Sequence, residues 1–174
     1  MYARGGFKRL VDEYIKKYGK RLYGLCLTLC AFSDEADDLY QDTWLKVLKN
    51  ISQYDETKEF EPWLTKICVN TYRNKLRRIA KAPFYNRFSD GDEKDRVLES
   101  VSAEHPKDYG DLHKAIDKLP EKYRITVILF YFNDLDLKSV ASTLGIPVGT
   151  VKSRLNKAKK LIKEELNREP DLQF

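Results

Sequence analysis

The sequence predicts an all-α protein of two small helical domains, residues 1–80 and 111–168, joined by a flexible linker over residues 81–110. Apolar residues recur at spacings of three and four along most of the chain, which is the period of an amphipathic helix. Stretches with the period-two alternation of a half-buried strand are too short to predict a sheet. Proline, glycine and many acidic residues interrupt the helical pattern between the two domains, as is typical of a linker.

The first domain is expected to hold three helices. An apolar stripe from Phe7 to Leu29 predicts the first of them. The second is entered through Ser33, which we expect to be its N-cap, and acidic residues follow at the positive end of the helix dipole. The third starts at Pro62, a residue suited to the first turn of a helix, and its apolar stripe continues to Ile79.

The second domain is expected to begin with a helix around Leu112–Leu119 and a further helix after Pro120. The stretch Leu137–Leu155 then has the pattern of a helix-turn-helix. Ala141 is small where the two helices cross, and Gly145 follows where the turn needs a residue that can adopt a positive φ. The sequence therefore predicts a DNA-binding motif in this domain.

Composition and charge exclude several classes of protein. The chain has 174 residues, a net charge of +5 and 42% hydrophobic residues, which is too many for a disordered chain. Its longest apolar stretch is too short to cross a bilayer, and its N-terminus lacks a signal-peptide core, so we expect a cytoplasmic protein. Three cysteines argue against a disulfide scaffold, and two histidines without a Cys-x-x-Cys pattern give no reason to expect a metal or cofactor.

The second helix of the helix-turn-helix carries a basic face. Its segment from Gly149 to Lys163 holds six lysines and arginines and no carboxylate. Serine and asparagine can read base edges in the major groove, while lysine and arginine can bind guanine or phosphate. A solvated basic helix is the alternative, but the complete helix-turn-helix spacing favours DNA contact.

The third helix of the first domain also has a basic face, opposite its apolar stripe, formed by Lys66, Asn70, Arg73, Asn74 and Arg77. The aromatic residues Tyr54, Phe60 and Trp63 precede it or lie in its first turns. Cations beside aromatic rings suit an unpaired strand, because bases stack on the rings while phosphates are neutralised. Core packing is the alternative for the aromatic residues: we expect Trp63 and Tyr72 in the core, and Tyr54 and Phe60 more open.

The second helix of the first domain has the opposite charge. Asp38, Gln41, Asp42 and Leu45 share the face turned away from its apolar stripe. An exposed leucine within an acidic surface favours a basic protein helix as the partner, because the acids would repel nucleic acid. Acidic residues that serve only solubility are the alternative.

Four segments together resemble the extracytoplasmic-function (ECF) sigma factors, group IV of the sigma-70 family. Residues 34–47 resemble the helix that binds the clamp of RNA polymerase, and residues 63–76 resemble the helix that recognises and opens the −10 element. Residues 119–124 and 140–155 resemble the helices that read the −35 element. The resemblance implies a sigma region 2 bundle in residues 1–80 and a sigma region 4 helix-turn-helix in residues 111–168.

The resemblance also implies a role for each candidate residue. Contacts with polymerase would come from Asp38, Gln41, Asp42 and Leu45. Contacts with the −10 element would come from Tyr54, Phe60, Lys66, Asn70, Arg73, Asn74 and Arg77, with a flipped base held by the loop before Phe60. Contacts with the −35 element would come from Thr150, Lys152, Ser153, Arg154, Asn156, Lys157 and Lys160. Some relatives have aromatic or arginine residues in place of Asn156 and Lys157, so the DNA sequence that is read stays open.

The implied function is a sigma factor that binds core RNA polymerase and directs promoter-specific transcription initiation. The implied partners are the β′ clamp and β flap of polymerase, promoter DNA, and a membrane-bound anti-sigma factor that covers both binding faces. Polymerase supplies the catalysis, so we expect no enzymatic activity and no small-molecule substrate. The protein would associate with the nucleoid when active and be held at the membrane when inhibited.

Several alternatives stay open at this point. A transcription regulator that acts without polymerase would not need the acidic face. A nucleic-acid enzyme would need clustered carboxylates for metal ions, or a nucleophile with a base. The linker would have a span of roughly 30 Å as a random coil and serves either as a solvated tether or as an occupant of a basic polymerase channel. Cys26, Cys30 and Cys68 lie in apolar helical settings and are expected to pack as small hydrophobes, with a redox switch as the alternative.

Overall fold

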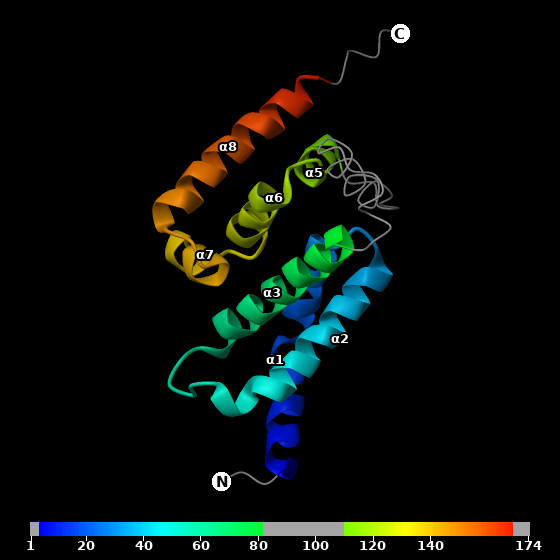
Figure 1. Cartoon of the computed structure of the whole chain (residues 1–174), viewed down its shortest axis with the longest axis vertical. Helices are drawn as coiled ribbons and strands as arrows, with labels where there is room; N and C mark the ends of the chain where they lie inside the picture. Colours follow the sequence, from blue (N-terminus) through cyan, green and yellow to red (C-terminus); the bar gives the residue numbers. More distant parts are fainter. Residues whose placement is uncertain (1–3, 82–109, 169–174) are drawn as a thin grey trace. The chain divides into compact units, whose positions relative to one another are not determined.

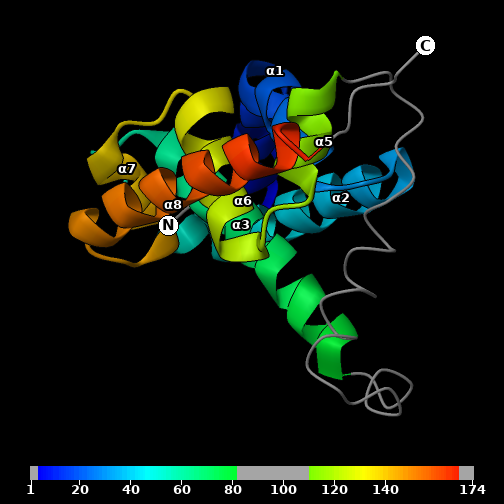
Figure 2. The ribbon, with the colours of Figure 1, turned by 90° about the horizontal axis from the view of Figure 1, so that it is seen from above.

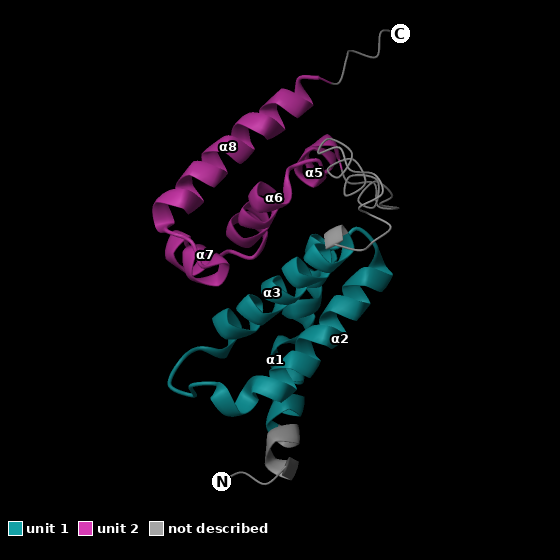
Figure 3. Ribbon diagram, in the orientation of Figure 1, with its two compact units in different colours: residues 1–90 teal, residues 91–174 magenta. Residues whose placement is uncertain are grey.

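The computed structural model describes residues 4–81 and 110–168. The chain divides into two compact units, residues 1–90 and 91–174 (Figure 3). Within the described ranges all regular secondary structure is helical, as the sequence predicts (Figure 1). The predicted linker, residues 81–110, lies almost entirely outside the described residues.

Unit 1 is a bundle of three long helices: α1 (Arg4–Leu29), α2 (Ser33–Asn50) and α3 (Phe60–Lys81), with a short 3₁₀ helix η1 (Ile51–Gln53) after α2. Each long helix packs against the other two. The apolar stripes meet in a core that includes Val11, Leu25, Leu29, Leu39, Val47, Leu64 and Val69. The last turns of α3 extend away from α1 and α2 (Figure 2), so the basic end of this helix is open to solvent.

Two helices of unit 1 begin at other residues than predicted. Phe32 precedes α2 in extended conformation, with φ −116° and ψ 151°, and Ser33 is the first helical residue rather than the N-cap. Helix α3 begins at Phe60, which leaves Pro62 inside the first turn. Proline is tolerated there because the first N–H groups of a helix have no intrahelical acceptor.

A glycine sets how closely α1 and α2 approach. A Cβ atom added to Gly19 of α1 would lie 2.7 Å from the hydroxyl oxygen of Tyr40 on α2. The ring of Tyr40 is held edge-on against Tyr23 and Trp44, with ring centroids 5.6 Å and 6.2 Å apart. The two helices therefore meet at a position where a larger residue would displace an aromatic ring.

Unit 2 combines the short helices α5 (Asp111–Asp117), α6 (Glu121–Val127) and α7 (Leu137–Leu144) with the longer helix α8 (Val148–Leu166). A π-helical turn, η3 (Ile128–Phe132), continues directly from α6, and the helical period did not predict it. Helix α8 packs against α5, α6 and α7. The core of the unit includes Ile116, Ile125, Leu129, Val140, Val151, Leu155 and Ala158.

The turn between α7 and α8 has the predicted helix-turn-helix geometry. Gly145 has φ +66° and ψ 40°, in the left-handed region that favours glycine. Its N–H and that of Ile146 both donate to the carbonyl of Ala141. Asp136 caps the start of α7, because its carboxylate accepts the backbone N–H of Ser139 at 2.6 Å. This hydrogen bond holds the pKa of Asp136 below its usual value.

Candidate nucleic-acid and partner interfaces

The acidic face of α2 consists of Asp38, Gln41, Asp42 and Leu45. All four side chains are exposed, and Leu45 is 53% exposed. The opposite side of the helix is buried in the core, which fixes the direction of this face. Leu48, one turn further along, is also exposed at 43% and was not among the residues predicted from the sequence. The spacing of three residues from Leu45 was the available signal, since it places both leucines on adjoining parts of the helix surface.

Two of the carboxylates of α2 interact with side chains of the neighbouring helices of unit 1. The hydroxyl of Tyr23 donates to the carboxylate of Asp37 at 2.8 Å, and this hydrogen bond is the main reason that the pKa of Tyr23 is raised. The ammonium of Lys75, on α3, lies 3.5 Å from the carboxylate of Asp38. An exposed ion pair of this kind contributes little to stability. It does show that the acidic face of α2 borders the positive charge of α3.

The basic face of α3 consists of Lys66, Asn70, Arg73, Asn74 and Arg77. Arg73 is half-buried and the other four side chains are exposed. The guanidinium of Arg77 donates to the side-chain oxygen of Asn74 at 3.3 Å. The structure therefore brings the five predicted residues together along more than three turns of one helix.

The aromatic residues near the start of α3 form one cluster with α1. Phe60 is only 3% exposed, so the prediction that its ring is open is wrong. The ring stacks on Tyr14 of α1 with 3.8 Å between centroids and also contacts Tyr54 and Trp63. Trp63 is half-buried rather than fully buried, whereas Tyr72 lies in the core as predicted. Tyr54 is half-buried, and burial is the main cause of its raised pKa.

The loop of residues 54–59 is ordered by its own side chains. The carboxylate of Asp55 accepts hydrogen bonds from the backbone N–H of Thr57 at 3.1 Å and from its hydroxyl at 2.7 Å. The Lys58 ammonium lies 3.3 Å from Asp55, and the hydroxyl of Tyr54 donates to the carbonyl of Lys58. The hydrogen bonds from Thr57 are the main cause of the lowered pKa of Asp55. Residues 55–59 are all exposed, so the loop presents a defined polar surface beside the aromatic cluster.

The basic face of α8 lies in unit 2. Lys152, Ser153, Asn156, Lys157 and Lys160 are exposed, while Thr150 and Arg154 are half-buried. The inner side of the helix is formed by Val151, Leu155 and Ala158, all buried. The hydroxyl of Ser153 donates to the carbonyl of Thr150 at 2.9 Å, within the helix. The predicted set therefore lies on the part of α8 that follows the helix-turn-helix turn.

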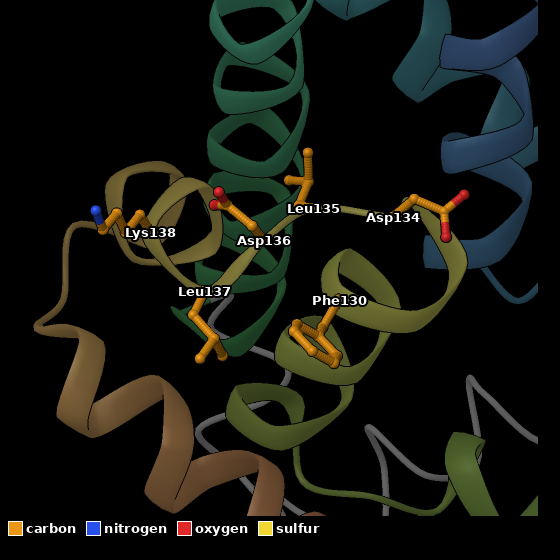
Figure 4. Close-up of a pocket in the computed structure, with 6 residues that line it drawn as sticks. All are labelled: Phe130, Asp134, Leu135, Asp136, Leu137 and Lys138. Atoms are coloured by element: carbon orange, nitrogen blue, oxygen red, sulfur yellow. The ribbon is translucent and has the colours of Figure 1, made fainter.

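A small pocket lies between η3 and α7, and η3 also carries two exposed aromatic rings. The pocket has a volume of about 580 Å³ and is lined by Phe130, Asp134, Leu135, Asp136, Leu137 and Lys138 (Figure 4). Tyr131 and Phe132, in the same π-helical turn, are 48% and 43% exposed. Neither ring was predicted as a site residue from the sequence, because the π-helical turn exposes rings that a regular helical period would place differently. Asp134 has φ +51°, an uncommon conformation for a residue with a side chain.

Residues 4–81 and 110–168 contain no cluster of three or more histidine, cysteine, aspartate or glutamate side chains placed to hold a metal ion. None of the helices in these ranges has the length and apolar character needed to span a bilayer.

Two helical units that each present a basic helix, one of them in a helix-turn-helix, define a two-module transcription factor. Comparison with family models gives the particular family. The model of sigma-70 region 2 matches residues 14–82, and the model of sigma-70 region 4 matches residues 109–162. Sigma factor SigV of Bacillus subtilis is 33% identical over 162 residues, which cover 93% of this chain and 94% of SigV. ECF sigma factor SigW of the same organism is 29% identical over 92% of this chain and 88% of its own length.

The chain belongs to the ECF sigma factors of the sigma-70 family, which bind core RNA polymerase and direct promoter-specific transcription initiation. The alternative of a regulator that acts without polymerase is therefore excluded. Two solved structures share the fold. Sigma factor RpoE in complex with the anti-sigma factor NepR from Bartonella quintana has a TM-score of 0.67, with 23% identity, 91% of this chain and 98% of RpoE covered. CnrH in complex with the cytosolic domain of CnrY has a TM-score of 0.66, with 19% identity, 96% of this chain and 94% of CnrH covered.

Proposed function

We propose that the acidic face of α2 is the surface of unit 1 that binds the clamp of polymerase. Asp38, Gln41, Asp42 and Leu45 are exposed together on it, and Leu48 extends its apolar part. An apolar centre among carboxylates suits a partner helix that carries both leucine-type and basic side chains. The exposure of Leu45 within this acidic surface is the observation that supports the proposal most strongly, because a surface made only for solubility has no use for it.

The basic face of α3 and the 54–59 loop are proposed to bind and open the −10 element. Lys66, Asn70, Asn74 and Arg77 are open to a DNA strand, and the half-buried Arg73 lies among them. Phe60 has a different role from the one its sequence position implied. Its buried ring anchors the loop to α1, while the exposed loop residues Thr57 and Lys58, with the half-buried Tyr54, supply the surface for a flipped base.

Helix α8 is proposed to lie in the major groove at the −35 element. Lys152, Asn156 and Lys157 are exposed on the basic face, and the amide of Asn156 has the donor and acceptor pair that recognises adenine. Thr150, Ser153, Arg154 and Lys160 would position the helix through phosphates or read neighbouring bases. The two basic faces, on separate units, would contact the two promoter elements at the same time, with residues 81–110 as the tether.

Tyr131, Phe132 and the neighbouring pocket are proposed to bind the β flap of polymerase. Exposed aromatic rings beside a pocket are typical of protein interfaces, and they lie on elements that carry none of the proposed DNA contacts. The ammonium of Lys159, on α8, lies 5.9 Å from the centre of the Tyr131 ring. Unit 2 would therefore hold DNA and polymerase on different elements.

An anti-sigma factor is proposed as the regulator, because the solved structure of sigma factor RpoE contains the anti-sigma factor NepR, and that of CnrH contains the cytosolic domain of CnrY. It would cover the acidic face of α2 and the basic faces, and a membrane-bound form would keep the protein away from the nucleoid. We further propose domain limits of 1–80 and 111–168, a cytoplasmic location, and no catalytic activity of the chain itself.

A binding assay with purified core RNA polymerase tests the proposed polymerase contact. Asp42→Arg places a positive charge opposite a basic partner, and we expect at least a tenfold loss of affinity for core polymerase, measured with purified components. Asp12→Arg on α1, which makes the same change at an exposed position, is the matched control. Binding of duplex DNA by unit 2 should be the same in both variants. Equal affinity of the two variants for core polymerase would refute the proposed contact.

A further inference from the structure

Two cysteines from different helices face each other in the core of unit 1. The sulfur atoms of Cys26 on α1 and Cys68 on α3 lie 3.8 Å apart, and both residues are 0% exposed. The two residues are 42 positions apart in the chain, so only the packing of α1 on α3 brings them together. A third thiol, Cys30, is 4% exposed and lies one turn beyond Cys26, with its N–H bonded to the carbonyl of Cys26 at 2.9 Å.

Packing alone does not need two thiols at this contact. Buried cysteine usually serves as a small hydrophobe, a task that alanine or valine performs equally well. Two sulfur atoms already in contact, however, are separated from the length of a disulfide bond by less than about 2 Å. The two thiols at this contact can therefore form a disulfide bond, which ordinary apolar side chains cannot do.

We propose that Cys26 and Cys68 are a reversible oxidation site, at which a peroxide joins α1 to α3 through an intramolecular disulfide. One thiol attacks the peroxide, which yields a sulfenic acid and one molecule of water when the oxidant is hydrogen peroxide. The second thiol then attacks the sulfenic sulfur and releases a second water. The pair loses two electrons and two hydrogens, and the peroxide is reduced.

Burial determines when this reaction takes place. The contact with Cys68, followed by desolvation, raises the pKa of the Cys26 thiol far above its usual range. A protonated thiol is a poor nucleophile, so the folded protein is expected to stay reduced under ordinary conditions. Opening of the α1–α3 contact exposes the thiols, and subsequent refolding brings the sulfur atoms together again.

A disulfide between Cys26 and Cys68 would close a loop of the chain that contains much of unit 1. Residues between Cys26 and Cys68 include all of α2 and the whole 54–59 loop. Both sulfur atoms are in the interior, whereas the acidic face of α2 and the basic face of α3 point to solvent. The bridge therefore holds the bundle together without covering either face, and it restricts the unfolded chain. Its chemistry does not depend on the proposed roles of these faces.

The test is oxidation of the full-length chain by hydrogen peroxide, followed by alkylation of free thiols and peptide mapping. We expect a monomeric product that is lighter by two hydrogens, contains a Cys26–Cys68 linked peptide, and is restored by dithiothreitol. Cys26→Ala and Cys68→Ala should each lose this product, and Cys30→Ala should keep it. Absence of the linked peptide from the wild type, or a bridge that uses Cys30 instead, would overturn the proposal.

A second measurement does not depend on how well the core variants fold. Urea unfolding of the wild type, oxidised and reduced, should show a higher midpoint for the oxidised protein, and dithiothreitol should abolish the difference. A bridge that leaves the midpoint unchanged or lowers it would show that the disulfide does not fit the native packing of α1 on α3, and would also overturn the proposal.

Discussion

Each of the two units exposes a basic helix, but the surroundings of that helix differ between them. In unit 1 the basic helix α3 packs beside the acidic helix α2, and an ion pair between Lys75 and Asp38 joins the two surfaces. In unit 2 the basic helix α8 packs through its apolar stripe on the short helices α5, α6 and α7, and its basic face is on the other side. Unit 1 therefore places opposite charges on neighbouring surfaces, which fits the proposal that it binds both polymerase and an opened DNA strand. Unit 2 presents a single helix, which suits a groove of duplex DNA.

The segments that precede the two basic helices, α3 and α8, also differ between the units. The 54–59 loop of unit 1 is long enough to present several polar groups, and Asp55 organises it through Thr57 and Lys58. The turn before α8 is short and depends on the positive φ of Gly145. A loop with its own internal hydrogen bonds can form a receptor for one base, whereas a tight turn only orients a helix. The following predictions test this comparison.

The largest expected effect comes from leucine-to-alanine substitutions in the two cores, which test whether the units fold independently. Leu39 and Leu129 are both fully buried, one in each unit, and replacement of either by alanine should lower the stability of its own unit by about 2–5 kcal/mol. Both tryptophans of the chain, Trp44 and Trp63, lie in unit 1. The urea transition followed by tryptophan fluorescence should therefore shift in Leu39→Ala and stay in place in Leu129→Ala. Equal shifts would mean that the units unfold together.

The turn of unit 2 gives the next effect in size. Gly145→Ala should destabilise unit 2 by about 1–2 kcal/mol, because a residue with a Cβ is strained at positive φ. Binding of duplex −35 DNA should weaken, while binding of single-stranded −10 DNA by unit 1 should not change. Gly149→Ala is the matched control, since it lies within α8 and a Cβ there meets no atom within 4 Å. A control variant that weakens duplex binding as much as Gly145→Ala would refute the role of the turn.

Salt dependence should distinguish the two kinds of DNA contact. Lys157→Gln in α8 should lower the slope of log affinity against log salt by about 0.9, which is the change expected if this lysine contacts one phosphate of a duplex. Arg77→Gln in α3 should lower the slope for single-stranded DNA by about 0.7. Fluorescence anisotropy at several salt concentrations measures both slopes. An unchanged slope for either variant would exclude that residue from phosphate contact.

The smallest expected effect is a pH dependence at the start of α7. The folded-state pKa of Asp136 is lowered, so its contribution to stability is present above the unfolded pKa of about 3.9 and is lost as the pH falls through the folded value. Asp136→Asn keeps a good N-cap without a titrating carboxyl and should lose this dependence. Amide hydrogen exchange of Ser139, followed as the pH falls from about 5 through and below the unfolded pKa of about 3.9, would report it. An acid response of Asp136→Asn equal to that of the wild type would contradict the assignment.

The features that the sequence predicted correctly depend mostly on patterns within short stretches of the chain. Helical period placed the long helices, and the left-handed turn at Gly145 followed from the spacing of the motif, since only a few residue types tolerate that conformation. The five residues of the α3 face were found because one helix carries all of them. Their roles in binding stay predictions.

Tertiary packing accounts for what the sequence missed. Phe60 is buried because it stacks on Tyr14, a residue 46 positions earlier whose proximity no local pattern reveals. The exposed rings of Tyr131 and Phe132 depend on a π-helical turn that has no signature in the 3.6-residue period. The contact between Cys26 and Cys68 was invisible for the same reason, since it exists only where α1 meets α3.

The close approach at Gly19 has a practical consequence for engineering. Helix glycines are common targets for stabilisation, since alanine is favoured over glycine by about 1 kcal/mol inside a helix. Two such positions in α1, Gly19 and Gly24, should respond differently to alanine. Gly24 has no atom within 4 Å of an added Cβ, so alanine there should raise the melting temperature, whereas alanine at position 19 would push against the Tyr40 hydroxyl and forfeit that gain.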